Sequence, residues 1–251
     1  MMSVLIFGAR GQMGRVLIDL WKEKKPEDQL IPVIRKTSLP REDGEVTLEQ
    51  AGRGDVLIDF SKPEALEEVL EYCLMNNTPL VLASTGHDDE AERKISEASN
   101  RIPIFYSANL SLGVYVLKTL AKAAAELLGD AADIEIIEKH HHKKQDAPSG
   151  TALMLLDAVR KEENGDKLVF GRHGKAQRQP GEIGVHAIRG GTIIGEHTVL
   201  FAMADESIEL THRGESKRLF ATGAMKAAEY IIKQEPGLYG MDDLINGRNE
   251  R

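Results

Sequence analysis

The chain has little of what marks secreted, membrane-bound or nucleic-acid-binding proteins. Cys73 is its only cysteine, so it cannot close a disulfide within itself, which favours a reducing, cytoplasmic location. No stretch approaches the roughly 18 apolar residues of a membrane helix. The short apolar run at the beginning lacks the basic segment of a signal peptide, so we expect no membrane partner. Asp and Glu number 40 against 32 Lys and Arg, and this acidic excess argues against nucleic acid as a partner.

What is present over the first hundred residues is an alternation of short apolar runs with amphipathic helical patterns. The apolar runs lie at 4–7, 30–34, 55–60, 79–83 and 104–106. Short apolar runs between helices are typical of buried parallel strands in βαβ units. The alternation predicts an α/β fold of Rossmann type, in which a doubly wound parallel sheet carries helices on both faces.

After residue 107 the pattern changes. A long helical pattern at about 111–128 leads to a strand at 134–138, and three strands then follow closely at 184–189, 192–203 and 207–212. Strands joined by so few residues are expected to form antiparallel hairpins, because a parallel crossover needs about a dozen residues or more. We therefore predict a second, α+β domain of largely antiparallel strands. Spacing alone leaves open whether the last helical pattern returns to the first domain.

A glycine-rich turn links the first apolar run to the first helical pattern. Its residues are Gly8, Ala9, Arg10, Gly11, Gln12, Met13 and Gly14. A side chain at Gly8 or Gly11 would keep the backbone away from a pyrophosphate, whereas Gly14 lets the helix pack on the strand. The N–H groups and the positive end of the helix would then bind the phosphates. The spacing is looser than the usual fingerprint and an ordinary tight turn is the alternative, but its position predicts dinucleotide binding.

Two cations, Arg35 and Lys36, end the second apolar run. About 20 residues past such a turn, NAD-binding proteins usually place an acid. Cations there would instead attract the 2′-phosphate of NADPH, so we predict that NADPH is preferred over NADH, which is still accepted. Arg10 is a candidate third cation. A solvated basic strand end is the alternative interpretation.

A cationic loop followed by a helix start is the most informative segment. Three histidines, His140 to His142, and Lys144 lie between a strand and Pro148-Ser149-Gly150-Thr151. Ser149 is a natural N-cap, which leaves the N–H groups of Gly150 and Thr151 to bind an anion such as a carboxylate. Imidazoles and an ammonium add positive charge and a proton source near neutral pH. The segment predicts a site for a small, multiply anionic substrate that becomes protonated.

Other interpretations of the nearby polar residues are weaker. The three histidines with Asp146 could bind a metal, but adjacent histidines diverge and the lysines repel a cation, so we predict no metal. A merely solvated loop is the other alternative. Glu135 and Glu138 lie three apart on a strand and point to opposite faces, so they do not form an acid–base pair. Later strand histidines, including His197, are expected to be structural.

The segment E-x-H-H-x-x-K-x-D-A-P-S-G-T-A, which spans 138–152, resembles the signature of the dihydrodipicolinate reductase family. Further segments agree with this family in order along nearly the whole chain. They lie at 8–15, 58–63, 84–86, 107–114, 189–191, 195–199 and 238–241.

The resemblance implies roles for individual residues. By similarity His140 is the catalytic acid/base and Lys144 its partner as proton donor. His141 contacts the substrate, and Ser149, Gly150 and Thr151 form the carboxylate site. The cofactor would be lined by Gly8, Ala9, Arg10, Gly11, Gln12, Met13, Arg35, Lys36, Phe60, Ala83, Ser84, Thr85, Ser107, Ala108, Asn109 and Leu110.

The resemblance also implies an activity and an assembly. The activity is NAD(P)H-dependent reduction of the cyclic imine dicarboxylate derived from 4-hydroxy-tetrahydrodipicolinate to tetrahydrodipicolinate, without a metal, in lysine and diaminopimelate biosynthesis. The implied architecture is a dinucleotide-binding domain over 1–110, a substrate-binding and oligomerisation domain over 111–215, and a C-terminal helix over 216–251 that returns to the first. A homotetramer is expected. The alternatives are a Rossmann reductase or dehydrogenase of another small imino or amino acid, and a non-catalytic dinucleotide-sensing protein.

Overall fold

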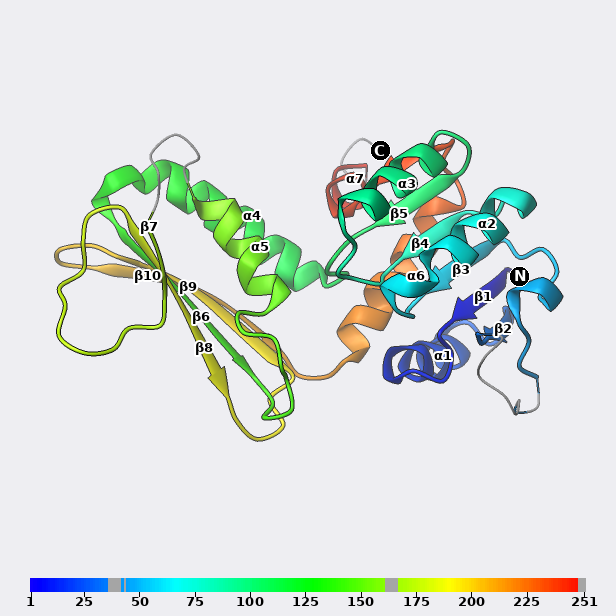
Figure 1. The fold of residues 1–251 in the computed structure, drawn as a ribbon, viewed down its shortest axis with the longest axis horizontal. Coiled ribbons are helices and arrows are strands. Elements are labelled where there is room, and N and C mark those ends of the chain that lie inside the picture. Colours follow the sequence, from blue (N-terminus) through cyan, green and yellow to red (C-terminus); the bar gives the residue numbers. More distant parts are fainter. Residues whose placement is uncertain (36–41, 43, 161–166, 248–251) are drawn as a thin grey trace. The chain divides into compact units, whose positions relative to one another are not determined.

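The computed structural model describes residues 1–35, 42, 44–160 and 167–247. The chain forms two compact units (Figure 1). Unit 1 combines Met1–Ser111 with the chain from Lys217 onward, and unit 2 is Leu112–Ser216. Unit 2 is therefore inserted into unit 1, and each is described by itself.

Unit 1 is built on a parallel sheet. Its strands are β1 (Ser3–Phe7), β2 (Gln29–Val33), β3 (Val56–Asp59), β4 (Leu80–Leu82), β5 (Pro103–Tyr106) and β11 (Gly237–Tyr239). They lie in the order β11-β5-β4-β3-β1-β2, and each neighbouring pair is parallel. The central strands β3 and β4 are buried along their whole length and are apolar except for Asp59 at the end of β3, because both faces of the sheet are covered. The predicted doubly wound sheet is confirmed.

Helices cover both faces of this sheet. They are α1 (Gln12–Lys24), α2 (Leu66–Asn76), α3 (Asp89–Ser99), α6 (Arg218–Ile231) and α7 (Met241–Asn246), with short 3₁₀ turns at Leu48–Gln50 and Pro63–Ala65. Helices α2 and α3 bury their apolar sides in a cluster with Leu5, Leu57 and Leu80. Helix α6 packs on α1 and contacts β3, β4 and β5. The chain thus comes back from the inserted unit to complete the first one.

Unit 2 is a sheet with two helices on one face. Its strands are β6 (Asp133–His140), β7 (Lys167–Phe170), β8 (Glu182–Arg189), β9 (Gly195–Ala202) and β10 (Ser207–Gly214). Helices α4 (Leu112–Leu128) and α5 (Gly150–Val159), with a 3₁₀ turn at Gly129–Ala131 between α4 and β6, complete it. Leu155 of α5, Ile136, Val185 and Phe201 form part of its core.

The strand pairing of unit 2 corrects one expectation. The order is β10-β9-β6-β8-β7, so β8 and β9 do not form the predicted hairpin, although β9 and β10 do. Strand β6 lies between β8 and β9, parallel to β8 and antiparallel to β9. The short connection 190–194 passes over the end of β6, where the Gly190 N–H donates to the His140 carbonyl at 2.9 Å. The sheet is therefore mixed, and the histidine loop leaves from its central strand.

Helix α6 approaches the segment after β5 so closely that only glycine fits at Gly223. A methyl group added there would lie 1.8 Å from the carbonyl oxygen of Leu110. We expect Gly223→Ala to lower the free energy of unfolding by about 1–3 kcal/mol, because overpacking forces the backbone apart. Urea denaturation measures this, with Thr222→Ala as the matched control. Equal unfolding midpoints for the two variants would contradict the close packing.

Candidate active site

The glycine turn lies at the carboxyl end of β1, where the strand order reverses between β1 and β3. Ligands of open α/β sheets bind at such a point. Gly8 has a φ of +81°, and an added Cβ would lie 2.9 Å from the backbone of Phe60. An added Cβ at Gly14 would lie 2.3 Å from the Gly8 carbonyl oxygen. The glycine turn therefore contacts the end of β3 and the first turn of α1, and glycine is required at Gly8 and at Gly14.

The N-terminus of α1 is open to an anion. Its N-cap, Gly11, supplies no side-chain hydrogen bond, and the first turn contains no acidic residue. A Cβ at Gly11 would come within 3.0 Å of the Gly8 carbonyl oxygen. An uncapped helix N-terminus behind a turn without side chains fits the pyrophosphate of a dinucleotide.

The other residues expected to contact the cofactor gather at the same edge of the sheet. Since the strands are parallel, their carboxyl ends meet there. Lys36 lies outside the described residues. The described residues that follow strand ends are Arg35 after β2, Phe60 after β3, Ala83, Ser84 and Thr85 after β4, and Ser107, Ala108, Asn109 and Leu110 after β5.

Ser84 ties two of these strand ends together. Its hydroxyl donates to the carboxylate of Asp59 at 2.8 Å and lies 3.1 Å from His87 Nε2. Asp59 is fully buried and also accepts the Ser61 N–H at 2.8 Å. Burial raises the pKa of Asp59 in spite of these hydrogen bonds. Ser84 therefore joins the ends of β3 and β4, and His87 is in contact with it.

Arg10 is paired with an acid that sequence reasoning did not foresee. Its Nε and Nη2 donate to the Glu45 carboxylate at 2.9 and 2.6 Å. The hydrogen bond from Arg10, opposed by burial, lowers the pKa of Glu45, so this acid is ionised near neutral pH. Arg10 is therefore not an uncompensated third cation beside Arg35.

In unit 2 the acid/base candidate His140 ends the central strand. Its Nδ1 lies 2.7 Å from a carboxylate oxygen of Glu138, two residues earlier on the same face of β6. Glu138 is fully buried. It also accepts two hydrogen bonds from the Arg189 guanidinium, both at 2.7 Å, and one from the Ser149 N–H at 3.0 Å. The carboxylate thus joins β6, β8 and the beginning of α5.

The protonation states follow from these contacts. Burial disfavours ionised Glu138, but hydrogen bonds from Arg189, His140 and Ser149 outweigh it and lower its pKa. For His140, burial outweighs the attraction of Glu138, and Lys144 and Arg189 add to it, so its pKa is lowered. A pKa below its ordinary value favours the neutral form of His140 at neutral pH. The sequence had suggested an imidazolium already in place. An anionic substrate would raise its pKa by adding negative charge nearby.

The helix start predicted beside the histidine loop is present. Ser149 is the N-cap of α5, and its hydroxyl accepts the Ala152 N–H at 3.2 Å. Gly150 is exposed, with open space where a side chain would stand. Because the Ser149 N–H is bound to Glu138, the first turn of α5, with Gly150 and Thr151, begins next to His140. The acid/base candidate and a helix N-terminus suited to an anion therefore adjoin within unit 2.

Two further loop residues lie near this helix start. Lys144 Nζ forms an ion pair with Asp146 at 2.8 Å. His141 is half-buried, and its Nδ1 has no hydrogen-bond partner among the described residues. Both side chains lie on the loop between β6 and α5, as the sequence requires.

Sequence reasoning missed three residues of this site: Glu138, Arg189 and His197. The His197 ring packs edge-on against His140, with centroids 5.1 Å apart, and its Nε2 lies 3.0 Å from the Ser149 hydroxyl. The two-residue period of a strand could have linked Glu138 to His140. Arg189 and His197 come from strands β8 and β9, and the signal for them in the sequence is the agreement of segments 189–191 and 195–199 with the family.

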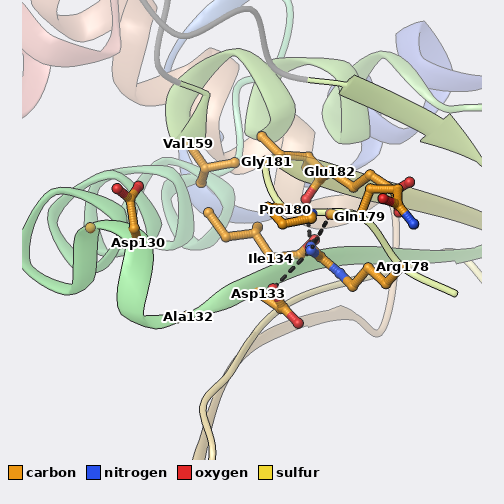
Figure 2. Close-up of a pocket in the computed structure, with 12 residues that line it drawn as sticks. Asp130, Ala132, Asp133, Ile134, Val159, Arg178, Gln179, Pro180, Gly181 and Glu182 are labelled. Atoms are coloured by element: carbon orange, nitrogen blue, oxygen red, sulfur yellow. Dashed lines mark hydrogen bonds and ion pairs between the residues drawn. The ribbon is translucent and has the colours of Figure 1, made fainter.

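Other features of the described residues do not compete with this site. A pocket of about 670 Å³ lies at the opposite end of β6 (Figure 2), where Arg178 is bound to Asp133 at 2.8 Å and to Glu135 at 3.2 Å. Its central cation is thus already compensated. Within the described residues no three His, Cys, Asp or Glu side chains gather as a metal site would require. None of the described helices is long and apolar enough to cross a bilayer.

A Rossmann unit with an inserted unit that holds a buried histidine beside a helix N-terminus is typical of two-domain, pyridine-nucleotide-dependent oxidoreductases. Family comparison narrows this class. Residues 2–110 match the model of the N-terminal domain of dihydrodipicolinate reductase, and residues 113–245 match that of its C-terminal domain. The chain belongs to the dihydrodipicolinate reductase family.

Comparison with individual relatives supports this family assignment. The chain is 45% identical over 252 residues to a 4-hydroxy-tetrahydrodipicolinate reductase of Caldanaerobacter subterraneus subsp. tengcongensis and 40% identical over 251 residues to one of Clostridium tetani, with 98% of each chain covered. The fold resembles that of a dipicolinate-bound dihydrodipicolinate reductase from Paenisporosarcina sp. TG-14, with a TM-score of 0.76 and 23% identity over 97% of this chain and 99% of that one. An aspartate dehydrogenase from Thermotoga maritima shares the fold more distantly, with a TM-score of 0.51 and 16% identity over 94% of this chain and 98% of that one.

The burial of His197 predicts a pH dependence of stability. Burial lowers its pKa to about 4, whereas in the unfolded chain it is near 6.5. Below pH 6.5 the unfolded chain therefore binds a proton that the folded chain does not, and stability falls as the pH drops from 6.5 to 4. The loss from this residue is on the order of 3 kcal/mol.

Urea denaturation of wild type and His197→Gln at a series of pH values measures this effect. The variant should lose less stability over that range. The comparison separates the contribution of His197 to the pH dependence of stability from those of His140 and His212, whose pKa values are also lowered by burial. Parallel stability curves for the two proteins would contradict the assignment.

Proposed function

We propose that this protein reduces the cyclic imine dicarboxylate derived from 4-hydroxy-tetrahydrodipicolinate to tetrahydrodipicolinate, in lysine and diaminopimelate biosynthesis. The observation that carries the proposal is the juxtaposition of His140 with the N-terminus of α5 through their shared contact with Glu138. A group able to transfer a proton would then lie beside a helix end able to bind a carboxylate. The names of the relatives and the dipicolinate bound to one of them support a ring dicarboxylate as the substrate class.

The cofactor would lie along the strand ends of unit 1. Gly8 to Met13 and the N-terminus of α1 would hold its pyrophosphate, and Arg35 with Lys36 would attract the 2′-phosphate of NADPH. The turns after β4 and β5 would lie near the nicotinamide. When bound, the reduced cofactor supplies a hydride to the ring. NADPH is the preferred donor and NADH a second one.

The residues of unit 2 handle the anionic groups and the proton. The N–H groups of Gly150 and Thr151 bind one ring carboxylate, Ser149 fixes their orientation as the N-cap, and His141 contacts the substrate as well. The substrate's negative charge raises the pKa of His140, whose Nε2 then takes up a proton. His140 delivers this proton to the ring carbon adjacent to the one reduced, and Lys144 serves as its partner by replacing the proton and balancing negative charge.

We further propose that the protein acts in the cytoplasm as a homotetramer joined through the inserted unit. Exposed apolar side chains of this unit, Phe170 of β7, Ile188 of β8 and Ile193 of the 190–194 connection, support self-association. The single cysteine, Cys73, is buried as a free thiol, which suits a reducing compartment.

The substitution His140→Gln tests the proposed function. We expect kcat for the dicarboxylate to fall by roughly 10²–10³, because general acid catalysis is lost, while KM for NADPH stays nearly unchanged. The assay follows NADPH consumption with enzymatically generated substrate, and L-aspartate with NADP⁺ serves as the alternative reaction. His142→Gln, an exposed histidine of the same loop, is the control. Unchanged turnover in His140→Gln would remove this residue from the mechanism.

The Arg10–Glu45 pair predicts a shift in cofactor choice. Glu45→Gln removes the negative charge that holds Arg10 and so allows Arg10 to reach a 2′-phosphate. The kcat/KM for NADPH relative to NADH should therefore rise roughly two- to fivefold, the size of one partly exposed ion pair. Steady-state kinetics with both cofactors measure the ratio, and Glu49→Gln is the control. No change would show that Arg10 does not reach the phosphate, and a wild-type preference for NADH would overturn the NADPH assignment.

A further inference from the structure

The buried carboxylate of Glu138 uses its full hydrogen-bonding capacity. One oxygen accepts Arg189 Nη2 and the Ser149 N–H, and the other accepts Arg189 Nη1 and faces His140 Nδ1. A carboxylate offers about four acceptor positions, so each position has a partner. Burying a charge is tolerated when it is paired and hydrogen-bonded in this way.

This arrangement determines which nitrogen of His140 carries its proton. An ionised carboxylate only accepts hydrogen bonds, so Nδ1 must be the donor and the neutral ring has its lone pair on Nε2. Nε2 points toward Gly195 of β9, where an added Cβ would lie 3.1 Å away. Glycine at this position leaves Nε2 uncovered from that side.

We propose that Glu138, clamped by Arg189, is the positioning residue for His140: it holds the ring with Nδ1 protonated and Nε2 turned to the substrate, and it keeps the ring next to the N-terminus of α5. The inference deepens the proposed function and rests on the role of His140 given there. Glu138 does not itself touch the substrate or the reacting atoms.

Arg189 has a separate role in the arrangement of Glu138 and His140. A buried carboxylate without a second partner would hold His140 permanently as an imidazolium. The bidentate guanidinium shares that charge and so adds to burial, which is the main reason why the pKa of His140 is lowered. The charged and titratable groups that face His140 are Glu138 on β6, Arg189 on β8, His197 on β9, with His212 of β10 behind it, and Lys144 with Asp146 in the loop.

The substitution Glu138→Gln tests the inference with almost no change in volume. A Gln amide can donate to Nδ1, so the ring is free to adopt the opposite tautomer. We expect kcat to fall roughly 10- to 100-fold, with KM for NADPH unchanged, and the pH profile of kcat/KM to lose or shift the limb assigned to His140. ¹⁵N NMR of the histidine ring should show Nδ1 protonated in the wild type and a change of tautomer in the variant. An unaltered pH profile and ring spectrum would overturn the proposal.

The chain supplies a matched control three residues earlier. Glu135 lies on the opposite face of β6 and binds His186 Nε2 at 2.7 Å and Arg172 at 3.0 Å. Glu135→Gln therefore breaks a similar Glu–His–Arg cluster away from the site. It should leave kcat within about twofold, and size-exclusion chromatography checks that both variants keep the wild-type assembly. An equal loss of kcat in the two variants would mean that the effect is general destabilisation.

A double-mutant cycle separates this inference from the proposed function. If Glu138 acts only through His140, the double variant Glu138→Gln/His140→Gln is no slower than His140→Gln alone. Additive losses would contradict positioning. A normal rate in His140→Gln would instead refute the proposed function itself.

The variant Glu138→Asp is a second test that stays informative if Glu138→Gln does not fold. Glu138→Asp retains the charge for Arg189 but withdraws it from His140. We expect a kcat loss with a nearly unchanged Tm. Wild-type kcat in a folded Glu138→Asp variant would show that the contact with His140 has no catalytic value.

Discussion

The site of unit 2 depends on one buried carboxylate. Glu138 binds a guanidinium from β8, an imidazole from its own strand and the first amide of α5. A charge without water is stable only if its partners stay in place. The same interaction therefore fixes the relative positions of Arg189, His140 and Ser149, and with them the proposed acid/base group and the proposed anion site at the start of α5. The functional geometry is a consequence of how the protein compensates this charge.

A different constraint organises unit 1. Parallel strands deliver their carboxyl ends to one edge, and the glycine turn there leaves no room for side chains at Gly8 or Gly14. Backbone groups and a helix dipole, which need no titratable side chain, then form the anion site. One unit thus offers fixed partial charges to a cofactor, whereas the other offers a group that can gain and lose a proton.

Much of the fold and part of the candidate site could be predicted from patterns that involve only a few neighbouring residues. The Ser149 N-cap depends only on the few residues after it, and the strand ends of unit 1 follow from βαβ alternation, so both could be predicted from the sequence. The hairpin predicted between β8 and β9 was wrong, because β6 enters between them and the short 190–194 connection spans it. Proximity in sequence favours pairing, but a buried central strand with partners on both sides is more stable than an isolated hairpin.

The sequence by itself determined the parallel sheet with its glycine turn, the helix start at Ser149 and the histidine loop that precedes it, because periodicity and capping act over a few residues. Only the tertiary structure decided that Arg10 meets Glu45, that Arg189 and His197 surround His140, and that the pKa of His140 is lowered. Those contacts join residues tens of positions apart, and the pKa of a group depends on burial and on neighbouring charges that exist only once the chain has folded.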